Sequence, residues 1–345
     1  MVFLDLFSGI GGFSLGFKEA GFNITTHYFS EIDKHAIAIY KYHFKNAINV
    51  GNVTTLSGRS IARPNIVTFG SPCQDFSLAG QRAGLGGERS SLIWEAIRFV
   101  TECRPDVFIW ENVKGVFSSN AGADFWAVIK AFADIGSYRL EWQLLNTAWF
   151  LPQNRERVYL VGYTPTCRGD WRGIFPIGEN DRIPGKGDEE KRGKNSETCT
   201  AITSNYRRGV HAKGETLVIS HHGHKNKAPR KSKIVPTLCS ESHGHVSMIA
   251  DDVHDTITTA LGRNGSSKEY LKSCAREYSL TSNLRRLTEI ECERLQGFPD
   301  DWTRYGDYDG KVKEISKTQR YKTLGDAVSI PVVKAVALKI KELYS

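Results

Sequence analysis

The feature that most constrains the fold is a regular alternation of short apolar runs with helical patterns in the first half of the chain. The runs VFLDLF, DVFIWENV and RVYLVGY are typical of buried strands, and GFSLGFKEAG, DKHAIAIYKYHF and FWAVIKAFADIG are typical of helices. Strands and helices that take turns form βαβ units, which build a mostly parallel sheet covered on both faces. The sequence therefore predicts an α/β fold with a doubly wound, mostly parallel sheet.

A different texture follows this pattern. From Thr164 to about Asn283 the chain has short polar and β-branched segments with many Gly, Ser, Thr and basic residues. Three pieces, TCTAIT (198–203), VPTL (235–238) and DTITTAL (255–261), are each expected to form a short strand. This part of the chain indicates a second unit that is rich in loops.

The last sixty residues return to the first pattern. Helical periodicity reappears around Leu284 in LRRLTEIECERLQGF, and the chain closes with the amphipathic stretch AVSIPVVKAVALKIKELY, which has Pro331 in its first turn. We therefore predict one main domain made of residues 1–163 and 284–345. A smaller, loop-rich domain of residues 164–283 is inserted in it.

The charge of the chain is concentrated in this insert. The 345 residues carry a formal net charge of +8, while 40% hydrophobic and 24% charged residues are ordinary for a globular protein. Between Arg182 and Val235, thirteen Lys and Arg face five acids, so this stretch alone accounts for the excess. A solvated basic loop is one interpretation, but the concentration favours a surface that binds a polyanion such as nucleic acid.

Other sequence signals favour an intracellular, cytoplasmic protein. No apolar run approaches the roughly 20 residues of a membrane span, and Asp5 interrupts the first apolar stretch, which argues against a signal peptide. The seven cysteines are scattered and never have Cys-x-x-Cys spacing, which argues against a disulfide framework or a zinc ribbon. We expect reduced thiols, no membrane contact and no metal site.

Three motifs place polar residues where strands of the first half end. DLFSGIGGFSLGF (5–17) is a strand, a glycine turn and a helix, and Glu31 follows the second strand, where a carboxylate can accept hydrogen bonds from a ribose. A nucleotide-like cofactor fits this motif, although the glycines lack the Gly-x-Gly-x-x-Gly spacing and a plain tight turn is the alternative. Cys73 in FGSPCQDFS follows the end of another strand, and it is either a nucleophile or a packed thiol. Glu111 in ENV lies at the end of a third strand, and it is either an acid that faces the cleft or a helix-capping or surface carboxylate.

A fourth motif, QNRER, enters the strand VYLVGY. Arg155 and Arg157 are two residues apart, so they lie on one face of an extended chain. Two guanidinium groups aimed into a cleft can bind a carboxylate and a carbonyl oxygen together. Surface arginines are the ordinary interpretation of either residue alone.

The ordered set of motifs closely resembles the DNA (cytosine-5)-methyltransferase family, of the bacterial or phage restriction-modification type. The motifs are DLFSGIGGFSLGF, GSPCQDFS, ENV, QNRER, RRLTEIECERLQGFPDDW and GDAVSIPVV, and they cover nearly the whole chain outside the insert. The resemblance implies a Rossmann-like methyltransferase fold. It also implies that Cys73 adds to C6 of a cytosine, Glu111 holds the N3 edge, Arg157 binds O2 and Arg155 orients Glu111.

The same resemblance implies S-adenosylmethionine as the methyl donor. Phe7 is then expected against the adenine, Gly9 and Gly11 near the methionine end, and Glu31 on the ribose. Two positions depart from the family pattern. Asn52 stands where an aspartate is usual, and its amide oxygen can still accept from the adenine amino group. The last motif reads GDAV where Gly-Asn-x-Val is usual, so Asp326 cannot donate the amide N–H bonds, and we expect altered local geometry there.

The substrate implied by the resemblance is double-stranded DNA. A cytosine inside a duplex does not expose C6, so the base must be flipped out, and the glycine-rich segment 77–91 is suited to close over it. The residues expected to touch DNA are Ser77, Gln81, Arg82, Arg207, Arg208 and Lys231. A monomer on DNA, with a cognate restriction endonuclease as genetic partner, is expected. The transfer-RNA branch of the same family and a non-catalytic DNA-binding relative are the alternatives.

Overall fold

The structure is a computed structural model of the chain. It describes residues 1–71, 91–164, 173–178, 217–221, 230–232, 235–236, 246–251 and 283–344. Within these ranges no helix is long and apolar enough to cross a membrane.

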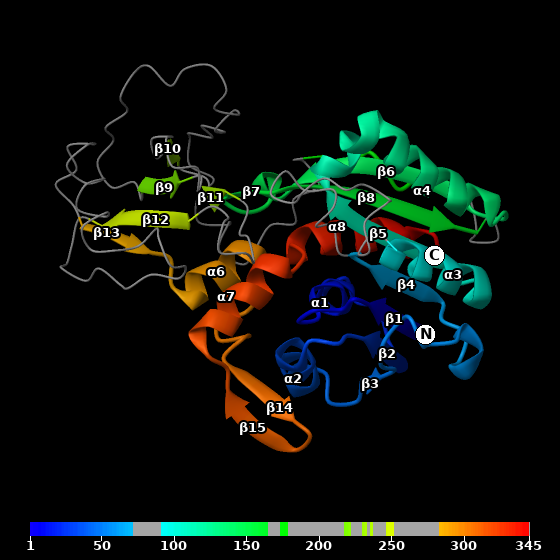
Figure 1. The fold of residues 1–345 in the computed structure, drawn as a ribbon, viewed down its shortest axis with the longest axis horizontal. Helices are drawn as coiled ribbons and strands as arrows, with labels where there is room; N and C mark the ends of the chain where they lie inside the picture. Colours follow the sequence, from blue (N-terminus) through cyan, green and yellow to red (C-terminus); the bar gives the residue numbers. More distant parts are fainter. Residues whose placement is uncertain are drawn as a thin grey trace.

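A seven-stranded sheet forms the centre of the fold, with the strand order β3-β2-β1-β4-β5-β8-β6 (Figure 1). The central strand β1 pairs in parallel with β2 on one side and with β4 on the other. Within this sheet β8 alone runs in the opposite direction to the other six strands, so it pairs antiparallel with β5 and with β6. The predicted doubly wound, mostly parallel sheet is therefore confirmed. The strands are β1 (Val2–Leu6), β2 (Thr26–Ser30), β3 (Ile48–Asn49), β4 (Ile66–Phe69), β5 (Val107–Val113), β6 (Arg139–Asn146) and β8 (Glu156–Tyr163).

Helices cover both faces of this sheet because successive residues of each strand point to opposite faces. Phe3 packs in an apolar cluster with residues of α1 and α8, whereas Leu4 and Leu6 pack in a second cluster with residues of α3 and α4. The two clusters are the two halves of the core. The helices that follow the strands of the first half, and the last helix, are α1 (Gly12–Glu19), α2 (Lys34–His43), α3 (Ser91–Cys103), α4 (Ala123–Asp134) and α8 (Ile330–Glu342).

The C-terminal part of the chain returns to the N-terminal part through a third apolar cluster. Trp302 and Leu295 pack there with Ile39 of α2 and with Ile10 of the first turn. In Figure 1 the orange segment of α6 and α7 lies beside the blue segment of α1 and α2. The elements of this return, which we call the C-terminal return, are α6 (Glu289–Gln296), β14 (Tyr305–Tyr308), β15 (Lys311–Glu314) and α7 (Lys317–Asp326).

The predicted return of helical structure around Leu284 is wrong at its start. Residues Asn283–Arg286 form the strand β13, which pairs antiparallel with β12 (Val246–Asp251). The helix α6 begins only after Thr288, whose side chain accepts from the N–H of Glu291 in a complete capping box. This cap sets the start of the helix, because it satisfies N–H groups that have no partner inside the first turn.

A four-stranded sheet of order β10-β9-β12-β13 belongs to the second part of the chain, with β9 (Leu217–His221) and β10 (Arg230–Ser232). The strand expected in VPTL is confirmed for β11 (Val235–Pro236), which pairs in parallel with β7 (Gln153–Asn154). The pieces TCTAIT and DTITTAL lie outside the described residues. The domain boundaries at 163 and 283 stay predictions.

A buried hydrogen-bond network lies inside the sheet below the first turn. The carboxyl group of Asp5 accepts from Thr68 Oγ1 at 2.8 Å and lies 3.2 Å from Ser14 Oγ, which in turn contacts the hydroxyl of Tyr40 at 2.6 Å. Burial raises the pKa of Asp5 to about 8, although the bonds from Thr68 and Ser14 oppose this shift. Burial also lowers the pKa of His27, which contacts the same Tyr40 hydroxyl, to about 4.

The raised pKa of Asp5 predicts a stability that falls with increasing pH. The folded chain keeps a proton that the unfolded chain releases above about 3.8, so folding loses stability as the pH rises towards 8. In Asp5→Asn the amide keeps both hydrogen bonds and does not titrate. We expect the variant to gain roughly 2 kcal/mol over the wild type between pH 6.5 and pH 8, as measured by urea denaturation. If the free energy of unfolding changed with pH in the same way in both proteins, Asp5 would not be protonated in the folded chain.

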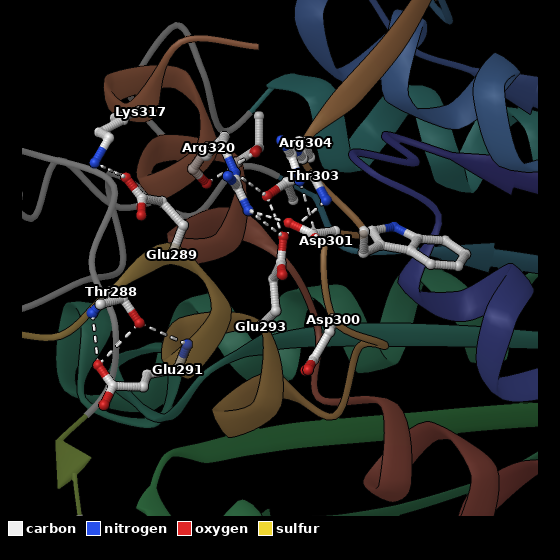
Figure 2. Close-up of polar contacts among 12 residues, drawn as sticks. Thr288, Glu289, Glu291, Glu293, Asp300, Asp301, Thr303, Arg304, Lys317 and Arg320 are labelled. Atoms are coloured by element: carbon white, nitrogen blue, oxygen red, sulfur yellow. Dashed lines mark hydrogen bonds and ion pairs between the residues drawn. The ribbon is translucent and has the colours of Figure 1, made fainter. Parts of the chain in front are cut away.

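A buried ion pair joins α6 to α7 in the C-terminal return (Figure 2). Glu293 is fully buried, and its Oε1 accepts from Arg320 Nη2 at 3.0 Å and from the backbone N–H of Thr303 at 2.8 Å. Arg320 Nε also donates to Thr303 Oγ1 at 2.9 Å, so the three groups form a closed set. Charges this deeply buried are tolerated because each is paired and hydrogen-bonded.

Removal of one partner of this pair is expected to destabilise the fold strongly. Arg320→Met should lower the free energy of unfolding by about 3 kcal/mol or more, because it leaves the carboxylate of Glu293 buried without its cation. The matched control is Arg294→Met, which removes an exposed ion pair between Arg294, on the same helix as Glu293, and Asp300, and should leave the denaturation midpoint nearly unchanged. Equal denaturation midpoints for the two variants would show that the buried pair contributes little to the stability of the fold.

Candidate active site

The turn after β1 has a backbone that few residues adopt. Phe7, Gly9 and Gly11 all have positive φ, of 52°, 53° and 87°. For a bulky residue such as Phe7 this is a strained conformation, and strain of this kind concentrates at functional sites. Gly11 has a second constraint, because a Cβ atom there would lie 2.6 Å from the ring of Phe44. The turn is thus fixed by two glycines and one strained aromatic residue.

Glu31 holds this turn against the end of β2. Its Oε2 accepts from the backbone N–H of Gly9 at 2.9 Å, and its Oε1 accepts from the N–H groups of Ile32 and Asp33 at 2.7 and 2.9 Å. The carboxylate is therefore oriented before any ligand binds. The contact of Glu31 with a ribose stays a prediction. The structure places the carboxylate of Glu31 at the glycine turn, where that contact would be made.

The edge of the sheet beside this turn is open and partly apolar. The side chain of Ile32 is 74% exposed, and Gly51 has positive φ with no atom within 4 Å of the position that a Cβ would take. Ser8 Oγ is buried and has no hydrogen-bond partner among the described residues. Asn52 is exposed and its Oδ1 accepts from the N–H of Thr54 at 3.1 Å. An open backbone, an exposed apolar side chain and a buried hydroxyl without a partner among the described residues fit a nucleotide-like cofactor. Ile32 was not predicted as a site residue, because its only signal in the sequence is its place between two acids.

The segment that ends α7 forms a further wall of this site. A Cβ on Gly12 would lie 2.6 Å from Val328, so the first turn packs directly against residues 325–328. Arg155 donates to the carbonyl oxygen of Ala327 at 2.8 Å, and Gln296 donates to that of Leu324 at 3.0 Å. Asp326 lies exposed in this segment. Asp326 is two residues from Val328, which packs on the turn, and its predicted role at the cofactor stays a prediction.

The predicted acid Glu111 lies at the end of β5 and pairs with Arg157. Arg157 Nε is 3.2 Å from Glu111 Oε1, and both side chains are largely buried. In the antiparallel register of β5 and β8, Val113 faces Arg157, which carries the guanidinium back towards Glu111. Arg155, which donates to the carbonyl oxygen of Ala327, was predicted to orient Glu111, and that role stays a prediction. Arg157 contacts the acid directly.

Residues of β5 also hold the chain that leads to Cys73. Trp110 Nε1 donates to Ser71 Oγ at 3.1 Å, and Asn112 Nδ2 lies 3.3 Å from the same oxygen. A Cβ on Gly70 would lie 3.2 Å from Glu111 Oε2. The last described residues before Pro72 thus lie against the predicted acid. Trp110 and Asn112, on either side of Glu111, were not predicted to have a role.

The remaining predicted residues have no described side chains. Lys231 lies in β10, where only the backbone is described. The roles assigned to these residues stay predictions. Cys73, Ser77, Gln81, Arg82, Arg207 and Arg208 lie outside the described residues.

Comparison with known proteins agrees with this geometry. The C-5 cytosine-specific DNA methylase family matches residues 1–342. The type II methyltransferase M.NgoBI of Neisseria gonorrhoeae is 31% identical over 341 residues, which cover 96% of this chain and 90% of that protein. The type II methyltransferase M1.ScrFI of Lactococcus lactis subsp. cremoris is 28% identical, over 99% of this chain and 78% of that protein.

Solved structures show the same fold. The crystal structure of the S. pombe Dnmt2 methyltransferase matches the whole of both chains with a TM-score of 0.63 at 18% identity. A putative DNA modification methyltransferase encoded within a prophage (E. coli) matches 99% of both chains with a TM-score of 0.58 at 20% identity. The family uses S-adenosylmethionine, which the open, acidic edge at the glycine turn suits. Since the family match extends over nearly the whole chain, this protein belongs to the C-5 cytosine-specific DNA methylases and is a DNA (cytosine-5)-methyltransferase.

Proposed function

We propose that the protein methylates cytosine within one short sequence of double-stranded DNA, after the base has turned out of the helix into the site. The observation that carries this proposal is the Glu111–Arg157 pair. It lies against Gly70 and Ser71, which lead to Cys73, at the carboxyl edge of the sheet. In open α/β sheets ligands bind at this edge, where the strand order reverses.

The chemistry follows from the weak nucleophilicity of cytosine C5. The Cys73 thiolate adds to C6, and the new C–S bond makes C5 electron-rich. S-adenosylmethionine supplies the methyl group as an electrophile. Glu111 donates or shares a proton at N3 and Arg157 binds O2, so both draw electron density from the ring as the thiolate adds. Loss of the C5 proton to water then expels the thiolate and leaves 5-methylcytosine.

The cofactor residues divide by the part of the ligand that they fit. We assign Glu31 to the ribose hydroxyls, because its carboxylate is already oriented beside the turn. Asn52 is assigned to the adenine amino group, with Phe7 and the exposed Ile32 against the faces of the ring. Asp326, beside the turn at Gly9 and Gly11, is assigned to the methionine end.

The insert between β8 and α6 is proposed to read the target sequence. Its basic stretch suits phosphate contacts, which position a protein on DNA, while a smaller set of side chains reads the bases. Arg207, Arg208 and Lys231 are the proposed contacts from the insert, and Ser77, Gln81 and Arg82 those from the closing segment. The relatives named above are type II methyltransferases, which supports a partnership with a restriction endonuclease. Action as a monomer on DNA is part of the same proposal.

Bisulfite sequencing of plasmid DNA tests the activity, the nucleophile and the specificity together. Cells that express the wild type should show protected cytosines at one short motif, and cells that express Cys73→Ala should show none. The control is Cys103→Ala. Cys103 is buried, its Sγ lies 3.6 Å from the carbonyl oxygen of Gly58, and burial raises the pKa of its thiol to about 12, so its loss should leave protection intact. If the folded wild type protects no DNA but methylates transfer RNA, the DNA substrate is wrong.

Glu111→Gln tests the acid separately from the cofactor site. We expect kcat to fall by about two to four orders of magnitude, because general acid catalysis at N3 is lost, while KM for S-adenosylmethionine changes little. Glu156→Gln is the control, because Glu156 lies on the neighbouring strand β8 and makes an exposed pair with Lys114. A similar loss in both variants would show that the effect of Glu111 is a general disturbance of this sheet edge.

A further inference from the structure

The C-terminal return contacts the backbone of the cofactor turn directly. Trp302 Nε1 donates to the carbonyl oxygen of Ile10 at 3.1 Å, across 292 positions of sequence. Ile10 lies between Gly9 and Gly11, which both have positive φ. Glycines have no side chain that could hold such a turn, so the contacts of its backbone decide its shape.

Trp302 is itself held in one position. Its ring stacks on His43 of α2, with the ring centroids 3.6 Å apart and the planes 3° from parallel. His43 Nε2 also lies 2.6 Å from the carbonyl oxygen of Trp302. The side chain of Trp302 is only 7% exposed. A donor fixed in this way imposes its position on Ile10.

A second contact joins the C-terminal return to the other side of the cofactor site. Lys322 Nζ of α7 lies 2.7 Å from Asp33 Oδ2, across 289 positions of sequence. Asp33 Oδ1 accepts from the N–H groups of His35 and Ala36 and so caps α2. The N–H of Asp33 donates to Glu31, the acid that holds the turn. Lys322 therefore acts on Glu31 through one intervening residue.

The charges around Lys322 belong to the same site. Its hydrogen bond with Asp33 raises the pKa of Lys322, and the nearby carboxylates of Asp326 and Glu31 raise it further. The ammonium group thus stands among three acids that surround the cofactor turn. It has two separable effects, because it orients Asp33 and it also reduces the negative potential that a cationic ligand meets.

We propose that Trp302 and Lys322 are positioning residues for the cofactor, which hold the turn at Ile10 and the pair Asp33 and Glu31 in the binding geometry. The C-terminal return then sets the affinity for S-adenosylmethionine, although the turn itself lies near the other end of the chain. This inference rests on the proposed placement of the cofactor at that turn.

Isothermal titration calorimetry with S-adenosylmethionine and with S-adenosylhomocysteine tests the proposal. Trp302→Phe keeps the ring and loses the N–H donor, and Lys322→Met keeps the stem and loses the charge. Each variant should bind both ligands about three- to tenfold more weakly than the wild type, because each loses one hydrogen bond that holds the site. KM for S-adenosylmethionine should rise by a similar factor, with kcat on DNA within about twofold.

Three further variants test whether the loss of affinity is specific to the contacts of Trp302 and Lys322. Lys322→Arg keeps a cationic donor for Asp33 and should restore most of the affinity. Trp142→Phe alters a tryptophan that is 42% exposed, and Lys334→Met breaks a pair with Glu19 that joins α8 to α1. Both controls should bind the ligands as the wild type does. Circular dichroism melting confirms that each variant is folded at the temperature of the titration.

The two ligands separate positioning from a simple effect of charge. S-adenosylmethionine carries a positive sulfonium that S-adenosylhomocysteine lacks. If Lys322 only changed the potential, Lys322→Met would bind S-adenosylmethionine more tightly than the wild type and would bind S-adenosylhomocysteine with unchanged affinity, and this result would overturn the proposal. Wild-type affinity in both Trp302→Phe and Lys322→Met would overturn it as well. A wild type that binds neither ligand would contradict the placement of the cofactor itself.

Discussion

The parallel pairing of β1 between β2 and β4 is the constraint on which the rest of the structure depends. The chain leaves β1, builds β2 and β3 on one side, and returns to form β4 and β5 on the other. The strand order reverses at β1, so a crevice opens at the carboxyl ends of β1 and β4. The cofactor turn leaves β1 there, and the residues that lead to Cys73 leave β4 there. Topology alone thus brings the proposed cofactor turn and the residues that lead to the proposed nucleophile to one edge.

The C-terminal return supplies the contacts that the loops at this edge of the sheet lack. Parallel strands end in loops, and loops need contacts from elsewhere to keep a single shape. Here the contacts come from residues 287–330: an apolar cluster around Trp302, the buried pair of Glu293 with Arg320, and the packing of Val328 on Gly12. A buried charge pair tolerates little displacement, because each ion loses its opposite charge when the other moves. The pair therefore ties α7, which leads into residues 325–328, to α6.

Sequence analysis predicted the parts of this arrangement that depend on local pattern. The strands and helices of residues 1–163 follow hydrophobic periodicity, and Glu111, Glu31 and Asp326 lie at the ends of elements, as their motifs indicate. It did not predict contacts between distant residues. That Arg155 donates to Ala327, and Trp302 to Ile10, depends on how the C-terminal return packs, which no spacing reveals. Residues 284–286 were predicted as helix because their strand partner, β12, lies more than thirty positions away.

The attachment of the insert has a consequence for how sequence recognition reaches the catalytic groups. On one side β11 pairs with β7, and the next residue after β7 is Arg155, followed two positions later by Arg157. On the other side β13 ends at Arg286, and only Leu287 and Thr288 separate it from α6. Within the described residues, each of these two attachments is short. If the insert reads the target, as proposed, its docking on the correct bases acts directly on the strand that carries Arg157 and on the helix that holds the cofactor wall. A short connection of this kind favours catalysis that depends on the sequence bound, rather than on the affinity for DNA alone.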